Sequence, residues 1–212
     1  MGKILEKAIF LIGLISFVSL LPYALGKKDK APVKKCDEPK IFAENLNYDW
    51  IMAQSAWYFP LLSKEDLIRQ SSDILKQKLD EVKTQDLTNA CFQATWEGLT
   101  PIITGFGGKK VSYDLSPLDF TNFNILGYEK AWKKGQGGVL YITQTDNKNY
   151  VFFVRCWKDG ERSWNVMTTS KKPSEEVKSK ILQHAKHLGF AVEGDDLETI
   201  DYEGCAQTKT EL

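Results

Sequence analysis

The stretch TDNKNYVFFVRCW, residues 145–157, decides the fold of this chain of 212 residues. It opens with turn-forming residues, 146–149, and continues into 150–157, a segment with bulky apolar side chains at nearly every position. Successive residues of a β-strand point to opposite faces, so a strand of this kind must be covered on both faces. Arg155 and Cys156 are set into it on opposite faces. Each face therefore needs its own covering layer.

Short segments of similar character lie on both sides of this stretch. We expect strands at Ala53–Phe59, Cys91–Thr104, Lys109–Leu115, Phe120–Trp132, Gly138–Thr145, Tyr150–Trp157 and Arg162–Thr169. Turn formers separate them, among them Gly107-Gly108, Ser116-Pro117, the glycine-rich residues 135–138 and Asp159-Gly160. Regular spacing with tight turns predicts an antiparallel meander, either a sandwich or an up-and-down barrel, and seven or eight strands suffice to close a small barrel.

Two segments show helical periodicity instead. In Leu61–Val82 apolar residues recur on one side, and Ser63 followed by Asp66 forms a start signal, so we expect a helix of about 20 residues. A second helix begins at Ser174 and stops near Gly189. Its apolar face consists of Val177, Ile181, Leu182 and Leu188.

Counting across the turns predicts which side chains share a face. If Asp159-Gly160 is a two-residue turn, Arg155 pairs with Trp164 and Phe153 with Val166. Counting across the preceding loop places Ile142 opposite Phe153 and Leu140 opposite Arg155. The candidate cavity-lining face therefore contains Leu140, Ile142, Phe153, Arg155, Trp157, Trp164 and Val166.

A closed barrel covers both faces, because one face lines the interior and the other lies under a helix and the N-terminal arm. A cysteine that bonds to the arm must point outward. Cys156 then places Phe153, Arg155 and Trp157 inside the barrel.

The N-terminus has the layout of a secretory signal peptide over residues 1–26, with a lysine-bearing start, an apolar run and small residues before a cleavage point after Gly26. The alternative is an uncleaved membrane anchor, but the run is shorter than the roughly 20 apolar residues of a membrane span. A basic arm, 27–35, follows. We expect a secreted, extracellular protein with no transmembrane segment in its mature form.

Secretion changes the interpretation of the four cysteines, which are Cys36, Cys91, Cys156 and Cys205. They are widely spread and include no C-x-x-C pair, so two disulfides are expected rather than a metal or redox site. The spacing alone leaves three pairings open.

Several motifs resemble those of lipocalins, especially the insect bilin-binding proteins and apolipoprotein D. They are Trp57-Tyr58, the series Thr145, Asp146, Tyr150 and Cys156, the helix after Pro173, and Cys205. The resemblance covers 36–205 and leaves a tail, 206–212. It implies an all-β, eight-stranded antiparallel up-and-down barrel with a C-terminal flanking helix. It also implies disulfides Cys36–Cys156 and Cys91–Cys205 and places Trp57 at the barrel base.

The chain departs from the family pattern at several positions. Ser55 and Asn147 replace a glycine and a tyrosine, and the arginine that closes the barrel base is missing around Thr168 and Thr169. The first loop is also unusually long and contains a helical insertion, 63–83. This extra helix either covers the open mouth as a lid, with Leu67, Ile74 and Leu75 facing the entrance, or packs on the outer wall.

The predicted interior is aromatic and aliphatic with one cation, which suits an elongated apolar ligand bearing a carboxylate near Arg155. The alternatives are an ion pair between Arg155 and a carboxylate of the mouth loop, and a barrel filled by Phe153, Trp157 and Trp164. We expect a secreted carrier of a fatty acid, retinoid, pigment or similar lipid, with no other cofactor. The competing hypothesis is a secreted interaction protein with a filled barrel, which acts through its surface on a protein receptor or a membrane.

Other classes of function lack support. The net charge is zero, which gives no electrostatic basis for nucleic-acid binding. His184 and His187 lack a third ligand for zinc, so we expect no metal site and interpret both as solvated helix positions. The chain shows no nucleophile elbow, phosphate loop or carboxylate pair, so an enzyme is not expected.

Overall fold

The computed structural model describes residues 36–83, 87, 89–98, 100–118, 122, 124–130 and 133–205. The predicted signal peptide (1–26), basic arm (27–35) and C-terminal tail (206–212) lie outside the described residues.

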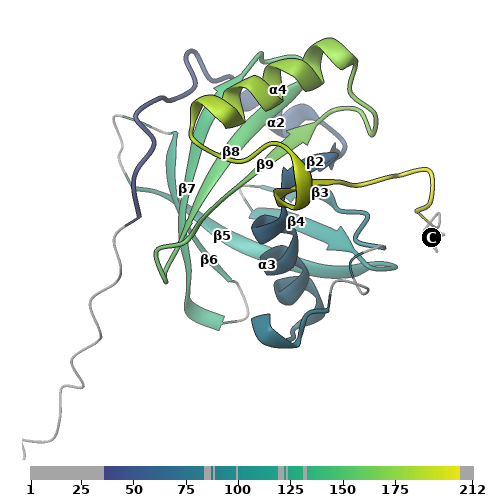
Figure 1. Cartoon of the computed structure of the whole chain (residues 1–212). Helices are drawn as coiled ribbons and strands as arrows, with labels where there is room; N and C mark the ends of the chain where they lie inside the picture. The colour runs from purple at the N-terminus through teal and green to yellow at the C-terminus, as the bar shows by residue number, and fades with distance from the viewer. Residues whose placement is uncertain are drawn as a thin grey trace, which may run out of the picture. The chain divides into compact units, whose positions relative to one another are not determined.

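Eight antiparallel strands close into an up-and-down barrel (Figure 1). They are β1 (Trp57–Tyr58), β3 (Gln93–Glu97), β4 (Thr100–Gly105), β5 (Lys109–Pro117), β6 (Ile125–Lys130), β7 (Lys133–Thr145), β8 (Tyr150–Trp157) and β9 (Arg162–Thr168). Each strand from β3 to β9 pairs with its neighbour in sequence, and β1 closes the ring between β3 and β9, with Tyr58 opposite Thr168. The barrel expected from the resemblance is confirmed, and the sandwich alternative is wrong.

The glycine-rich residues 135–138, predicted as a turn, instead lie inside the long strand β7. A Cβ atom at Gly137 would collide with the carbonyl oxygen of Tyr128, and one at Gly138 with that of Cys156. Glycine here permits close approach of the flanking strands rather than a reversal of the chain.

The predicted first strand, Ala53–Phe59, is shorter than expected. Its start belongs to helix α2 (Tyr48–Ala53), which is capped by Asn47, whose side chain accepts a hydrogen bond from the Trp50 backbone N–H at 3.0 Å. Strand character begins only at Trp57. A separate short strand, β2 (Leu61–Ser63), pairs with β9 and with β10 (Leu197–Thr199).

Helix α3 (Lys64–Leu75) occupies the middle of the predicted 20-residue helix. Its start agrees with the prediction, because the Ser63 side chain accepts a hydrogen bond from the Asp66 backbone N–H. The residues before it form β2, and Lys76 adopts a left-handed conformation (φ 56°) that ends the helix. A short 3₁₀ turn, η1 (Leu79–Glu81), follows. The predicted helix therefore has the correct N-cap but extends too far at its C-terminal end.

Helix α4 (Glu175–His187), capped by Ser174, confirms the second predicted helix and lies against the outer wall of β8 and β9 (Figure 1). A further 3₁₀ turn, η3 (Gly194–Asp196), leads to β10. In the part of the chain that the structure describes, no helix is both long and apolar enough to cross a membrane.

Both faces of β8 are buried, as the sequence predicts. One face belongs to the interior cluster with Trp57, and the other belongs to an outer cluster with Ile181 of α4. The disulfides are Cys36–Cys156 and Cys91–Cys205, so the pairing implied by the resemblance is confirmed. Cys156 points outward and holds the segment that leads away from Cys36 against the wall.

Candidate functional site: the barrel interior

The loop between β8 and β9 has three residues rather than two. Trp157 and Glu161 flank it, and the Trp157 backbone N–H donates to the Glu161 carbonyl at 3.0 Å. Gly160 adopts φ 87°, the conformation that a three-residue hairpin loop requires near its end. The predicted two-residue turn is therefore wrong.

The additional loop residue shifts the pairing by one position. Arg155 lies opposite Ser163, Val154 opposite Trp164, and Phe152 opposite Val166. Because a shift of one residue moves every side chain to the other face, Trp164 and Val166 lie outside, under α4, and do not line the cavity. Trp164 stacks on Phe152 there, with ring centroids 5.3 Å apart. Their prediction as cavity residues is wrong.

The pairing of β7 with β8 agrees with the prediction at the two pairs of residues closest to the site. Leu140 lies opposite Arg155 and Ile142 opposite Phe153. A bulge after Ile142 shifts the remaining pairs toward the loop, so that Thr145 lies opposite Val151.

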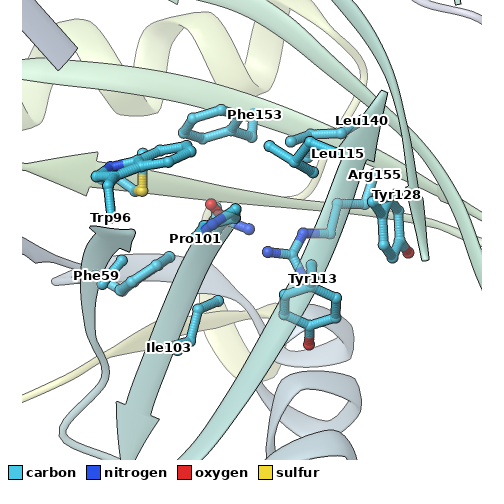
Figure 2. Close-up of a pocket in the computed structure, with 13 residues that line it drawn as sticks. Phe59, Trp96, Pro101, Ile103, Tyr113, Leu115, Tyr128, Leu140, Phe153 and Arg155 are labelled. Atoms are coloured by element: carbon cyan, nitrogen blue, oxygen red, sulfur yellow. The ribbon is translucent and has the colours of Figure 1, made fainter. Parts of the chain in front are cut away.

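The barrel interior contains a cavity with about 470 Å³ of space between protein atoms, including its opening (Figure 2). Its wall consists of Phe59, Ala94, Trp96, Pro101, Ile103, Tyr113, Leu115, Tyr128, Leu140, Phe153, Arg155, Asn165 and Met167. Leu140, Phe153 and Arg155 were predicted at this wall. Ile142 and Trp157 are buried in the same interior cluster but do not line the cavity.

Several wall residues were missed by the sequence analysis. Asn165 and Met167 face inward because of the register shift between β8 and β9. Tyr113 and Tyr128 come from β5 and β6. The available signal in the sequence was the alternation of apolar with polar residues, as in the series Val111, Tyr113 and Leu115.

Arg155 extends into the cavity from β8 (Figure 2). Its guanidinium carbon lies 5.8 Å from the ring centre of Tyr113 and 5.7 Å from those of Tyr128 and Trp157. Aromatic rings at this distance attract a cation through their quadrupoles, and the attraction grows when water is excluded. The side chain is 8% exposed.

A carboxylate from α3 accompanies this buried cation. Asp66 Oδ1 lies 3.6 Å from Arg155 Nε, and the Asp66 side chain has no exposed surface. Burial acts to lower the pKa of Arg155, but the nearby acidic groups, Asp66 first, outweigh burial and raise that pKa. Arg155 therefore remains charged, in the ion pair with a first-loop carboxylate that the sequence analysis kept as an alternative.

Asp66 is held by three neutral donors as well. It accepts hydrogen bonds from Ser163 Oγ at 2.8 Å, from Asn165 Nδ2 at 2.9 Å, and from Gln70 Nε2. Ser163 in turn accepts from Trp157 Nε1 at 2.8 Å. The carboxylate thus connects α3 to inward-facing residues of β9.

A second carboxylate of α3 is also turned toward the barrel. Asp73 accepts a hydrogen bond from the Tyr113 hydroxyl at 2.9 Å and forms an ion pair with Lys130. Burial raises the pKa of Asp73 more than these partners lower it. Through Asp66 and Asp73 the helix contacts side chains that point into the barrel, so α3 covers the interior and does not pack on the outer wall.

Arg69 anchors helix α3, which forms the roof over this end of the barrel, to the β8–β9 loop. Its side chain donates to Asp159 in the β8–β9 loop at 2.7 Å and pairs with Glu65 one turn earlier. The guanidinium also lies 4.9 Å from the ring centre of Trp157. The end of the barrel next to the β8–β9 loop is therefore closed by α3.

The opposite end of the barrel is closed around Trp57, which is completely buried. Its indole N–H donates to the Ile51 carbonyl of α2 at 3.0 Å, and Trp50 packs edge-on against it at 5.0 Å. Helix α2 thus packs over Trp57 in a chain that lacks the arginine of the lipocalin pattern. Asn147, which stands where the lipocalin pattern has a tyrosine, accepts a hydrogen bond from the Asn47 backbone N–H at 3.0 Å.

Polar atoms without partners mark the cavity wall. Among the described residues, Arg155 Nε and Nη1, Tyr128 Oη, Trp96 Nε1 and Asn165 Oδ1 are buried and have no hydrogen-bond partner. Buried polar groups in proteins are normally hydrogen-bonded, so these atoms are where a bound molecule would gain most.

One histidine differs from its prediction. His184 is buried rather than solvated, because it shares the inward face of α4 with Ile181. Its Nε2 lies 2.9 Å from Thr143 Oγ1, and its ring packs edge-on against Phe152. Burial lowers the pKa of His184 to about 4. His187 is exposed as predicted. Within the described ranges, no group of three or more His, Cys, Asp or Glu side chains could hold a metal ion.

No protein-family model matches this chain, and no curated protein matches it either. Solved structures do. The major allergen Per a 4 from cockroaches aligns with a TM-score of 0.52 at 11% identity, over 79% of this chain and 95% of that one. H1 crustacyanin from the lobster Homarus americanus gives 0.45 at 15% identity, over 77% and 88%. A variant of LTBP1 in complex with leukotriene C4 gives 0.49 at 12% identity, over 79% and 92%. At this level of identity the likeness to the cockroach allergen shows the fold alone.

Proposed function

In this chain, which has the lipocalin fold, we propose that the barrel interior binds a small apolar molecule whose oxygen-bearing end lies at Arg155. One observation carries the proposal. A buried guanidinium on a largely apolar wall keeps Nε and Nη1 without a hydrogen-bond partner among the described residues. A fold alone does not imply a function, so this site is the basis of the assignment.

The rest of the wall suits the body of such a molecule. Phe59, Ile103, Leu140 and Met167 contribute apolar surface to the cavity wall. Trp96, Pro101 and Leu115 are partly exposed, which indicates that the cavity opens on their side. A fatty acid, retinoid, pigment or similar lipid meets these requirements.

We propose further that the protein is secreted and acts as a carrier. Two disulfides that close long loops are typical of proteins from oxidising compartments, and the N-terminal residues have the composition of a signal peptide. If cells that express the full chain release a protein from which residues 1–26 have been removed, this would support secretion. Retention in the membrane fraction would contradict it.

The binding proposal is tested by mass spectrometry of organic extracts from protein purified under native conditions, together with lipid titrations followed by tryptophan fluorescence. We expect a co-purifying apolar molecule or a saturable change in fluorescence. An empty extract and no response to retinol, a fatty alcohol or a fatty acid would instead favour a filled barrel that acts through its surface.

Two arginine variants test whether the ligand contacts Arg155. Arg155→Met should weaken binding of a ligand with an oxygen-bearing end about tenfold or more, the loss of a hydrogen bond to a charged group. Arg162→Met is the matched control, because Arg162 lies on the same wall but turns outward, where it donates to the Leu188 carbonyl at 2.9 Å. Equal losses in both variants would contradict a ligand role for Arg155.

A further inference from the structure

We infer that this cavity selects neutral molecules with a hydroxyl or carbonyl end over the corresponding carboxylates, and that Asp66 of α3 sets this selectivity. The inference rests on the proposed binding function and narrows its ligand class. It replaces the carboxylate ligand that the single interior cation suggests from sequence.

The first argument is charge. Arg155 already has an anionic partner, since Asp66 lies 3.6 Å from its Nε and is completely buried. The other buried carboxylate of α3, Asp73, pairs with Lys130. The two buried carboxylates at the barrel end covered by α3, Asp66 and Asp73, are thus each paired with a basic side chain. An incoming carboxylate would lose its hydration without meeting a net positive charge, and repulsion from Asp66 would offset attraction by Arg155.

The second argument is that Asp66 cannot easily turn away from Arg155. Its two oxygens accept hydrogen bonds from Ser163, Asn165 and Gln70. Its backbone N–H is bound by Ser63 Oγ, which also bonds to the backbone of Trp164 in β9. Moving the carboxylate to admit a second anion would break several of these buried bonds, each costly to leave unmade.

The third argument is the kind of hydrogen bonds left open. In the described part of the chain the unpaired donors include Arg155 Nε and Nη1, and an unpaired acceptor, Asn165 Oδ1, lies on the same wall.

Asn165 and Arg155 are close together because both contact Asp66. A hydroxyl group can accept from Arg155 and donate to Asn165 Oδ1, so it matches both. A carboxylate has no proton to donate and would face the Asn165 oxygen as well as Asp66. A carbonyl matches the Arg155 donors without adding charge.

The test uses two matched pairs of probes, retinol with retinoic acid and dodecan-1-ol with dodecanoic acid, titrated by calorimetry near pH 7. For the unmodified protein we expect the alcohol of each pair to bind at least about tenfold more tightly than the acid. Asp66→Asn removes the negative charge with little change of shape, and we expect it to shift the acid-to-alcohol ratio toward the acid by about tenfold or more.

Two further variants keep the test decisive. Glu65→Gln removes a carboxylate of the same helix that pairs with Arg69, and it should leave the ratio unchanged. The double variant Asp66→Asn/Arg155→Gln removes both charges and should prefer the alcohol again.

The outcomes separate the two proposals. Tighter binding of the acid by the unmodified protein, or an unchanged ratio in Asp66→Asn, would overturn the selectivity while the binding function stands. If Asp66→Asn does not fold, the ratio for the unmodified protein still decides. Binding of no member of either pair would contradict the binding function itself.

Discussion

The Asp66 carboxylate lies 3.6 Å from Arg155 Nε, and the two side chains are 0% and 8% exposed. The pair joins a helix of the first loop to a strand of the barrel wall, so the same contact that neutralises the cavity cation also holds the roof in place. A ligand bound at Arg155 would therefore be coupled to the position of α3 through these two residues.

Removing the carboxylate should destabilise the fold. In Asp66→Ala, Arg155 becomes a buried charge without its ion-pair partner, and Ser163 and Asn165 lose their acceptor. We expect the free energy of unfolding to fall by about 3–5 kcal/mol, measured by chemical denaturation. Glu65→Ala, at a partly exposed pair on the same helix, should cost less than about 1 kcal/mol. Similar losses in both variants would mean that the buried pair has no special role.

Substitution of Trp164 should separate stability from ligand binding. Trp164 is completely buried on the outer face, so Trp164→Ala should cost about 3–5 kcal/mol of stability and leave ligand affinity nearly unchanged. Phe153 lines the cavity, so Phe153→Ala should weaken retinol binding as well as stability. Denaturation and fluorescence titration of both variants check this. A large loss of affinity in Trp164→Ala would speak against the observed register.

Removal of the Cys36–Cys156 disulfide should lower stability strongly. The bond joins residues 120 positions apart, and a loop of this length corresponds to about 4–5 kcal/mol in the chain-entropy model. The measurement is denaturation of the double variant Cys36→Ser/Cys156→Ser against the unmodified protein. A loss below about 1 kcal/mol would show that packing alone holds the N-terminal segment against β8.

The stability of the protein should decrease as the pH falls from 6.5 toward 4. Burial lowers the pKa of His184 from 6.5 to about 4, so in this range the unfolded state binds a proton at this residue that the folded state does not. Protons therefore favour unfolding, and the contribution of His184 is fully present only above pH 6.5. His184→Gln should flatten the pH dependence between pH 6.5 and 4, whereas His187→Gln, at an exposed position of the same helix, should retain it. An unaltered slope in His184→Gln would contradict the assignment.

Ligand binding should protect the roof helix from hydrogen exchange. Asp66 and Asp73 contact residues of the cavity wall, so an occupied cavity should slow exchange of the α3 amides over Leu67–Leu75. Helix α4 packs on the outer face and serves as the internal reference, with exchange unchanged. Equal protection of both helices would indicate a general stabilisation rather than contact through the roof.

Much of the fold follows from local patterns in the sequence. The strands β8 and β9 and the helix α4 agree closely with prediction, because alternation, turn residues and a serine cap act over a few neighbouring residues, whereas the predicted turn Ser116-Pro117 lies inside β5. The disulfide pairing followed from the family resemblance, since spacing alone left three possibilities. The cavity was predicted less well, with Leu140, Phe153 and Arg155 in its wall but Trp164 and Val166 outside it.

The sequence by itself determined that β8 must be buried on both faces and that Arg155 and Cys156 lie on opposite faces, because side chains alternate along any strand. Only the tertiary structure decided two further points. One is the three-residue loop at Gly160, which depends on backbone geometry and sets which residues of β9 face inward. The other is the pairing of Asp66 with Arg155, which requires α3 to fold over the barrel end. A buried charge needs a partner nearby in space, and the order of residues along the chain does not show which carboxylate will reach it.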